Sequence, residues 1–137
     1  MLKRKVLFTC IVVLMTWSGA LAGDSDPLFI NLTSADSHRS LMALGFAKAQ
    51  MERGHPLTVW FNDKAVLLAS VKNSAQFGEQ QKIMAAVMAK GAKILVCPMC
   101  SKTFGVSEAD LMKGARLSNP DVTGEALFQD NGKTLSW

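Results

Sequence analysis

Several patterns that would assign a function directly are missing from this 137-residue chain. It has no Gly-x-Ser-x-Gly motif and no phosphate-binding glycine loop, so it lacks the signatures of α/β-hydrolases and of P-loop enzymes. It has no internal repeat or low-complexity segment, and its composition, 49% hydrophobic and 19% charged, excludes a disordered or collagen-like chain. What remains is a small, apolar-rich chain of 14.8 kDa that can bury one hydrophobic core.

The start of the chain has the layout of a secretory signal peptide. Three basic residues at positions 3–5 precede an apolar run over residues 6–17, and an Ala-Leu-Ala sequence ends at Ala22. The apolar run is shorter than the roughly 20 residues that a membrane-spanning helix needs. The sequence therefore predicts a signal peptide over residues 1–22 and cleavage after Ala22. The mature chain, residues 23–137, is then one domain of a periplasmic or secreted protein with no membrane anchor.

Removing the predicted signal changes the charge of the protein. The whole chain has 15 Lys and Arg against 11 Asp and Glu, which gives a net charge of +4 and a pI of about 9.1. Residues 1–22 hold three of the basic residues and no acidic ones, so the remaining 115 residues carry a net charge of +1. These residues have no Lys/Arg cluster and no basic stripe interleaved with aromatics. The sequence therefore predicts no nucleic-acid partner.

Only two cysteines, Cys97 and Cys100, lie in the predicted mature chain, because Cys10 is inside the apolar run of the signal. Two cysteines cannot supply a framework of disulfides. A chain of about 115 residues can instead bury a hydrophobic core large enough to hold the fold.

Apolar runs of strand length alternate with longer helical patterns along the mature chain. Strands are predicted at residues 28–33, 57–61, 93–97, 115–117 and 134–137. Helices are predicted at residues 38–53 and 75–90, with shorter helical segments within 63–73, at 106–113 and after Pro120. Each connection between the first three strands exceeds ten residues, which favours parallel pairing. The sequence therefore predicts a layered α/β fold with a mainly parallel sheet of about five strands.

The chemistry is concentrated in the segment Cys97-Pro98-Met99-Cys100, at the end of the third predicted strand. Open α/β sheets bind their ligands at the carboxyl ends of parallel strands. Pro98 can begin a helical turn, and the free N–H groups at the start of such a turn favour a thiolate over a thiol. A thiolate is a nucleophile, and a second thiol three residues on can resolve what forms on the first. Cys97 and Cys100 are therefore the predicted catalytic residues, and no cofactor is predicted.

Other interpretations of this motif stay open at this point. The two cysteines could form a structural disulfide, which exported proteins often contain. A thioredoxin-type dithiol would normally follow the first strand of its domain, and this motif follows the third. A zinc site would need more ligands, and His38 and His55 lack paired spacing. A copper(I) site could use Met99 as a soft ligand between the cysteines.

The mature chain also resembles a known family. The features that carry the resemblance are a first strand at residues 27–33 leading into an Ala-rich helix, the turn at residues 53–56 leading into a strand that ends at Asn62, and Cys97 followed after seven residues by a Gly-Val pair. Over residues 27–137 these features resemble the DsrE/DsrF-like family of small α/β proteins. The resemblance implies a three-layer α/β/α fold and a homo-oligomer, often a trimer or hexamer.

The resemblance further implies a function in sulfur handling or sulfur transfer. In the sulfur-carrying members of the family, a cysteine at the position of Cys97 accepts sulfur as a persulfide from a donor protein or a small persulfide species. Cys100 is then a neighbouring or resolving thiol. The loop after the first strand is expected at the same sheet edge, where His38 and Arg39 are candidates to bind an anionic sulfur species. The alternative is a non-enzymatic binding module whose cysteine pair is a disulfide or a copper or zinc site.

Overall fold

The centre of the protein is a sheet of short strands. The computed structural model describes residue 23 and residues 25–137, and the predicted signal peptide lies outside these residues. The strands are β1 (Leu28–Leu32), β2 (Leu57–Phe61), β3 (Lys93–Val96), β4 (Ala115–Leu117) and β5 (Lys133–Ser136). The helices are α1 (Ser37–Glu52), α2 (Ser74–Ala89), α3 (Pro98–Thr103) and α4 (Pro120–Leu127), with 3-10 helices η1 (Asp63–Ala69), η2 (Val71–Asn73) and η3 (Glu108–Asp110). None of the helices in the described part of the chain combines the length and apolar character that crossing a bilayer requires.

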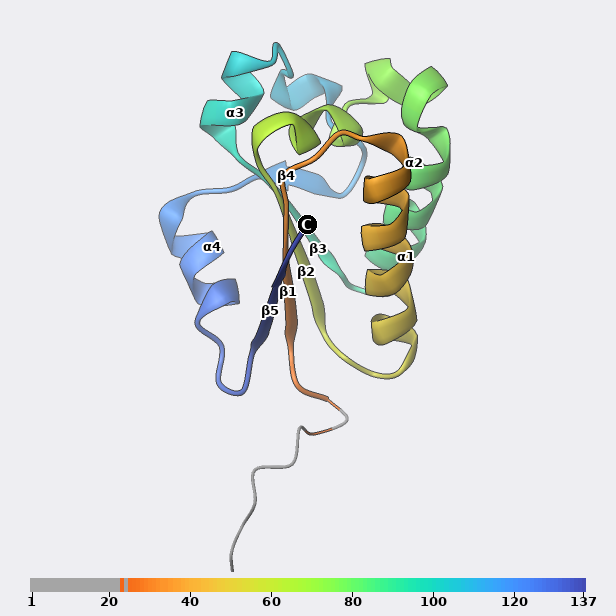
Figure 1. Cartoon of the computed structure of the whole chain (residues 1–137). Coiled ribbons are helices and arrows are strands. Elements are labelled where there is room, and N and C mark those ends of the chain that lie inside the picture. The colour runs from red at the N-terminus through yellow and green to blue at the C-terminus, as the bar shows by residue number, and fades with distance from the viewer. Residues whose placement is uncertain (1–22, 24) are drawn as a thin grey trace, which may run out of the picture.

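The strands run parallel in the order β4-β3-β2-β1-β5. The helices α1 and α2 lie on one face of the sheet, and α4 lies on the other face before the chain enters β5 at the edge beside β1 (Figure 1). The predicted α/β fold, with helices on both sides of a parallel sheet of about five strands, is confirmed. All strands therefore end at the same edge of the sheet, where α3 also lies (Figure 1).

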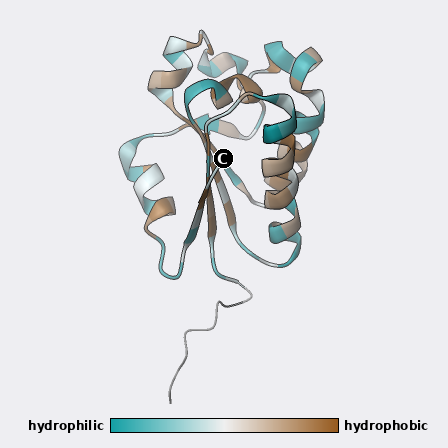
Figure 2. Cartoon of the chain, in the orientation of Figure 1, coloured by the Kyte–Doolittle hydropathy of each residue, from teal (hydrophilic) through white to brown (hydrophobic). Residues whose placement is uncertain are grey.

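The two faces of the sheet carry cores of different size, because alternate residues of a strand point to opposite faces. Ile30, Val59 and Ile94 belong to the larger core, which also contains buried residues of α1 and α2. Phe29 and Leu95 form a much smaller cluster with Ala126 of α4. Hydrophobic residues run along the middle of the sheet in Figure 2. The eight residues of α4 thus cover less of their face than the two sixteen-residue helices opposite.

Two differences from the sequence-based expectation affect the chain from the cysteine motif onward. The predicted helix over residues 106–113 is reduced to η3, because Leu111 is already extended and the N–H of Met112 donates to the carbonyl of Ala69 at 2.9 Å. The strand expected to include Cys97 ends one residue earlier, at Val96, so Cys97 is the N-cap of α3. This second difference places the Cys97 side chain at the junction between strand and helix.

Two buried glutamines of α2 fix the connections at the carboxyl edge of the sheet. The Nε2 of Gln80 donates to the carbonyl of Ser37, at the start of α1, at 2.8 Å. The Nε2 of Gln81 donates to the carbonyls of Leu68 and Ser70 at 3.1 and 2.9 Å. Because η1 packs against α3, these bonds also support the surroundings of the cysteine pair.

Candidate functional site

Cys97 lies where β3 passes into α3. Its N–H donates to the carbonyl of Phe61 at 2.9 Å, which holds it against the end of β2. Pro98 occupies the first turn of α3, and the Sγ of Cys97 accepts the backbone N–H of Cys100 at 3.3 Å. An N–H directed at sulfur is the kind of partner that a negatively charged sulfur requires. The helical turn that the sequence predicted after Pro98 therefore brings a donor to Cys97.

Cys100 lies in the first turn of α3, partly buried, and both cysteines are free thiols. Burial raises the pKa of the Cys100 thiol, and hydrogen bonding to the Cys97 side chain raises it further, whereas a backbone hydrogen bond from Asp63 lowers it. The balance favours the protonated form. The pair is therefore asymmetric, with Cys100 held as the protonated neighbour of Cys97.

Asp63 reaches Cys100 because the chain turns sharply at the end of β2. Its φ is +47°, in the left-handed region that Asp adopts more readily than most residues. The Asp63 carboxylate adds a like charge near Cys100 and contributes to the raised pKa of that thiol. Sequence reasoning missed this residue, because nothing in the predicted loop over residues 63–73 indicated a contact with the cysteine motif.

A groove of about 460 Å³ lies beside Cys97, on the face of the sheet that carries α4. Its lining residues come from β2, from α3 and from the segment that includes α4: Trp60, Cys97, Pro98, Met99, Ser118, Asn119, Pro120, Thr123, Gly124, Leu127 and Phe128. None of these residues is charged. Cys100 is not part of this wall, so of the two thiols only that of Cys97 borders the groove.

Trp60 is a wall residue that sequence reasoning did not assign to the site. It pairs in register with Leu95, two residues before Cys97, and residues two apart in a strand share a face. This alternation is the signal that could have placed Trp60 on the same side as Cys97. The indole Nε1 of Trp60 is buried and has no hydrogen-bond partner among the described residues.

A row of polar side chains continues from Cys97 toward β5. Asn62 and Cys97 directly follow the paired residues Phe61 and Val96. The Nδ2 of Asn62 donates to the Oδ1 of Asn31, whose own Nδ2 donates to the Oγ of Ser136 at 3.1 Å. The sequence indicated none of these contacts, since they join β1, β5 and the end of β2.

The predicted anion-binding residues lie in the first turn of α1. Both His38 and Arg39 are exposed, and the backbone N–H of Arg39 donates to the helix cap Asp36 at 2.8 Å. Neither residue lines the groove at Cys97, and α1 covers the opposite face of the sheet from α4. The structure thus brings Cys97 and Cys100 together but leaves His38 and Arg39 outside that arrangement. A role for the latter two in binding an anionic sulfur species stays a prediction.

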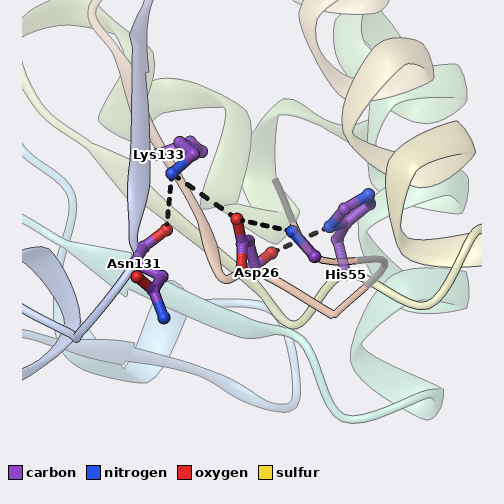
Figure 3. A network of polar contacts seen from close by, with 5 residues as sticks. Asp26, His55, Asn131 and Lys133 are labelled. Atoms are coloured by element: carbon purple, nitrogen blue, oxygen red, sulfur yellow. Dashed lines mark hydrogen bonds and ion pairs between the residues drawn. The ribbon is translucent and has the colours of Figure 1, made fainter. Parts of the chain in front are cut away.

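The second histidine of the chain, His55, also lies away from the cysteine pair. This residue lies before β2, at the opposite edge of the sheet, where its Nδ1 is 2.9 Å from the carbonyl oxygen of Asp26 (Figure 3). Lys133 approaches the Asp26 carboxylate there at 3.5 Å and donates to the carbonyl of Asn131 (Figure 3). Within the described residues, no group of three or more His, Cys, Asp or Glu side chains is arranged to hold a metal ion.

The comparison with protein families decides the classification of the chain. The model of the DsrE/DsrF-like family matches residues 27–131. The chain belongs to the DsrE/DsrF-like family. The family that the cysteine motif and the strand pattern resembled is thus confirmed for most of the chain. A comparison with curated proteins finds no match for this DsrE/DsrF-like protein.

Three solved structures are similar to this DsrE/DsrF-like protein, and each match covers 82% of the chain. The ychN protein from E. coli is 15% identical, with a TM-score of 0.70 over 99% of its chain. MTH1491 from Methanobacterium thermoautotrophicum, a protein of unknown function, is 12% identical, with a TM-score of 0.66 over 100% of its chain. BT1422 from Bacteroides thetaiotaomicron, a conserved protein of unknown function, is 20% identical, with a TM-score of 0.64 over 95% of its chain. At these identities the likeness concerns the fold.

Proposed function

We propose that this protein accepts a sulfur atom on Cys97 as a persulfide and passes it to an acceptor, with Cys100 as the neighbouring, resolving thiol. Membership of the DsrE/DsrF-like family is compatible with sulfur relay. The observation that carries the proposal is the asymmetry of the pair. The sulfur of Cys97 receives the N–H of Cys100 and borders a groove, whereas the pKa of Cys100 is raised by burial and by its contact with Cys97.

The chemistry needs no oxidant beyond the donor itself. The Cys97 thiolate attacks the outer sulfur of a donor persulfide R–S–SH, the donor S–S bond breaks, and the electron pair leaves on R–S⁻. An acceptor thiolate can then take the outer sulfur and restore the Cys97 thiolate. In a competing step, the Cys100 thiolate attacks the inner sulfur, which forms the Cys97–Cys100 disulfide and releases HS⁻. Since Cys100 is held protonated, this second step is slow at neutral pH.

The proposal places the protein in the periplasm or outside the cell. The layout of residues 1–22 supports export and cleavage after Ala22. Its partners are a sulfur donor or acceptor protein or a small persulfide species, and it works as a homo-oligomer. Exposed apolar side chains on α1 and β5 support self-association: Met42, Phe46 and Leu135 are each more than a third exposed, and the rings of Phe46 and Trp137 lie 5.8 Å apart.

Intact-mass spectrometry tests the assignment of Cys97. Reduced protein incubated with inorganic polysulfide should gain the mass of one sulfur atom, and Cys97→Ser should abolish this gain. Cys100→Ser should keep the gain and hold it for longer, because the internal resolving thiol is gone. If wild-type protein gains no sulfur, or if Cys97→Ser gains as much, the proposal is wrong. A Cys97–Cys100 disulfide that resists mild reductant in freshly isolated protein would favour a structural role instead.

A further inference from the structure

We propose that the groove beside Cys97 selects sulfur donors whose sulfur is attached to an uncharged, apolar group, such as an alkyl or aryl persulfide. This inference rests on the proposed function, because it names the substrate class of the same cysteine. It excludes glutathione-like persulfides and other donors with charged substituents as preferred substrates.

The composition of the groove favours an uncharged occupant. None of its eleven lining residues is charged, and of its serine, asparagine and threonine side chains two already hydrogen-bond to the backbone. The Oγ of Ser118 donates to the carbonyl of Val96 at 3.2 Å, and the Oδ1 of Asn119 accepts the N–H of Val122 at 2.8 Å. A carboxylate or ammonium group in this groove would lose its water without gaining a charged partner. An apolar group has no such loss.

The size and the walls of the groove suit a small apolar ligand. A volume of about 460 Å³ falls within the range of roughly 300–1,000 Å³ that is typical of small-molecule sites. Aromatic and thioether side chains, which favour apolar ligands, line it at Trp60, Met99 and Phe128. Met99 is 80% exposed and Phe128 is 82% exposed, so packing within the chain does not account for these two. An apolar occupant would cover them.

Cys97 is part of the groove wall, so an occupant of the groove lies next to its thiol. A donor whose apolar group occupies the groove brings its S–S bond to Cys97, whereas Cys100 lies outside this wall. The thiolate of Cys97 then takes the outer sulfur, the donor S–S bond breaks, and the apolar thiolate R–S⁻ leaves with the electron pair and takes a proton from water. The step exchanges one thiolate for another and needs no further reactant.

Gly124 offers a way to fill the groove without disturbing the fold. It lies on the α4 side of the groove, and a Cβ placed on it would meet only the Cδ2 of Phe128 within 4 Å, at a distance of 4.0 Å. Gly124→Leu should therefore project into the groove and exclude the apolar group. Gly45→Leu is the matched control, because a Cβ on Gly45 of α1 meets nothing within 4 Å and α1 covers the other face of the sheet.

The experiment compares the loading of Cys97 by benzyl persulfide, glutathione persulfide and inorganic polysulfide, with each rate divided by that of a free cysteine peptide. We expect benzyl persulfide to load Cys97 about tenfold faster than glutathione persulfide, which corresponds to burial of a small apolar group. Gly124→Leu should lose this preference, whereas Gly45→Leu should keep it and should load polysulfide at the wild-type rate. Equal normalised rates in the wild type, or a preference that survives in Gly124→Leu, would overturn the inference.

A second arm separates this inference from the proposed function. Alkylation of Cys97 by N-benzyl iodoacetamide, iodoacetamide and iodoacetate requires no sulfur transfer, and the benzyl reagent should react fastest after the same normalisation. If no donor loads sulfur but the benzyl reagent is preferred, the proposed function fails and the groove inference stands. If polysulfide loads Cys97 but neither arm shows an apolar preference, only the inference fails. Should Gly124→Leu not fold, Phe128→Ala at an exposed position should reduce the preference in both arms, and an unreduced preference would count against the groove.

Discussion

The raised pKa of Cys100 predicts how the lifetime of a Cys97 persulfide depends on pH. Release of sulfide within the pair requires the Cys100 thiolate, so its rate follows the thiolate fraction of that residue. Burial and the contact with Cys97 raise the pKa of Cys100 above its ordinary value of 9.0. Below that pH the thiolate fraction increases by about a factor of ten for each pH unit. We therefore expect sulfide release to rise about a hundredfold between about pH 7 and about pH 9, without levelling off.

The assay loads Cys97 with sulfur, removes the excess donor and follows two products. Sulfide is measured in solution, and intact mass reports the loss of the sulfur atom together with formation of the Cys97–Cys100 disulfide. Cys100→Ser is the control, in which the persulfide should persist at every pH and no internal disulfide can form. Circular dichroism at each pH verifies that the protein stays folded.

Two results would refute this reasoning. A release rate that does not change with pH would mean that a thiolate of Cys100 is not the attacking group. A rate that rises and then levels off well below pH 9 would mean that the attacking thiol has a lowered pKa, contrary to its burial. In either case Cys100 would not act as the protonated, slow resolving thiol of the pair.

Two further predictions concern stability. Gln81→Leu removes the hydrogen bonds to the buried carbonyls of Leu68 and Ser70 and should lower the free energy of unfolding by about 2 kcal/mol in urea titrations. Gln76→Leu, at an exposed position of the same helix, should change this free energy little. Equal effects of the two substitutions would contradict the supporting role of Gln81. The pKa of Cys100 is raised in the folded state, so its contribution to the free energy of unfolding is complete below the unfolded pKa of 9.0 and is lost as the pH rises through the folded pKa. The free energy of unfolding should therefore fall less above about pH 9 in Cys100→Ala than in the wild type. Parallel plots of unfolding free energy against pH for the two proteins would disprove this.

The sheet could be predicted from the sequence because its three central strands, β1, β2 and β3, are mainly apolar and the connections between them are long enough to favour parallel pairing. The position of β5 beside β1 could not be predicted, since the sequence of α4 does not determine which face of the sheet it crosses. Cys97 and Cys100 were identifiable from their spacing after a strand. The groove was not, because its walls join Trp60 of β2 with residues of α3 and α4 that are far apart along the chain.

The different surroundings of the two thiols indicate the direction in which sulfur would enter. Cys97 borders an uncharged groove, so a donor can reach it without facing a negative charge. Cys100 instead has the carboxylate of Asp63 nearby, which contributes to its raised pKa and would also repel an anionic sulfur species. Attack by Cys100 on an external donor is therefore disfavoured both by the lack of thiolate and by the local charge. Attack on a persulfide already formed at Cys97 requires only the loss of one proton, because the two side chains are already in contact. This order, with entry at Cys97 and resolution by Cys100, follows from the turn at Asp63 and from the N-cap position of Cys97.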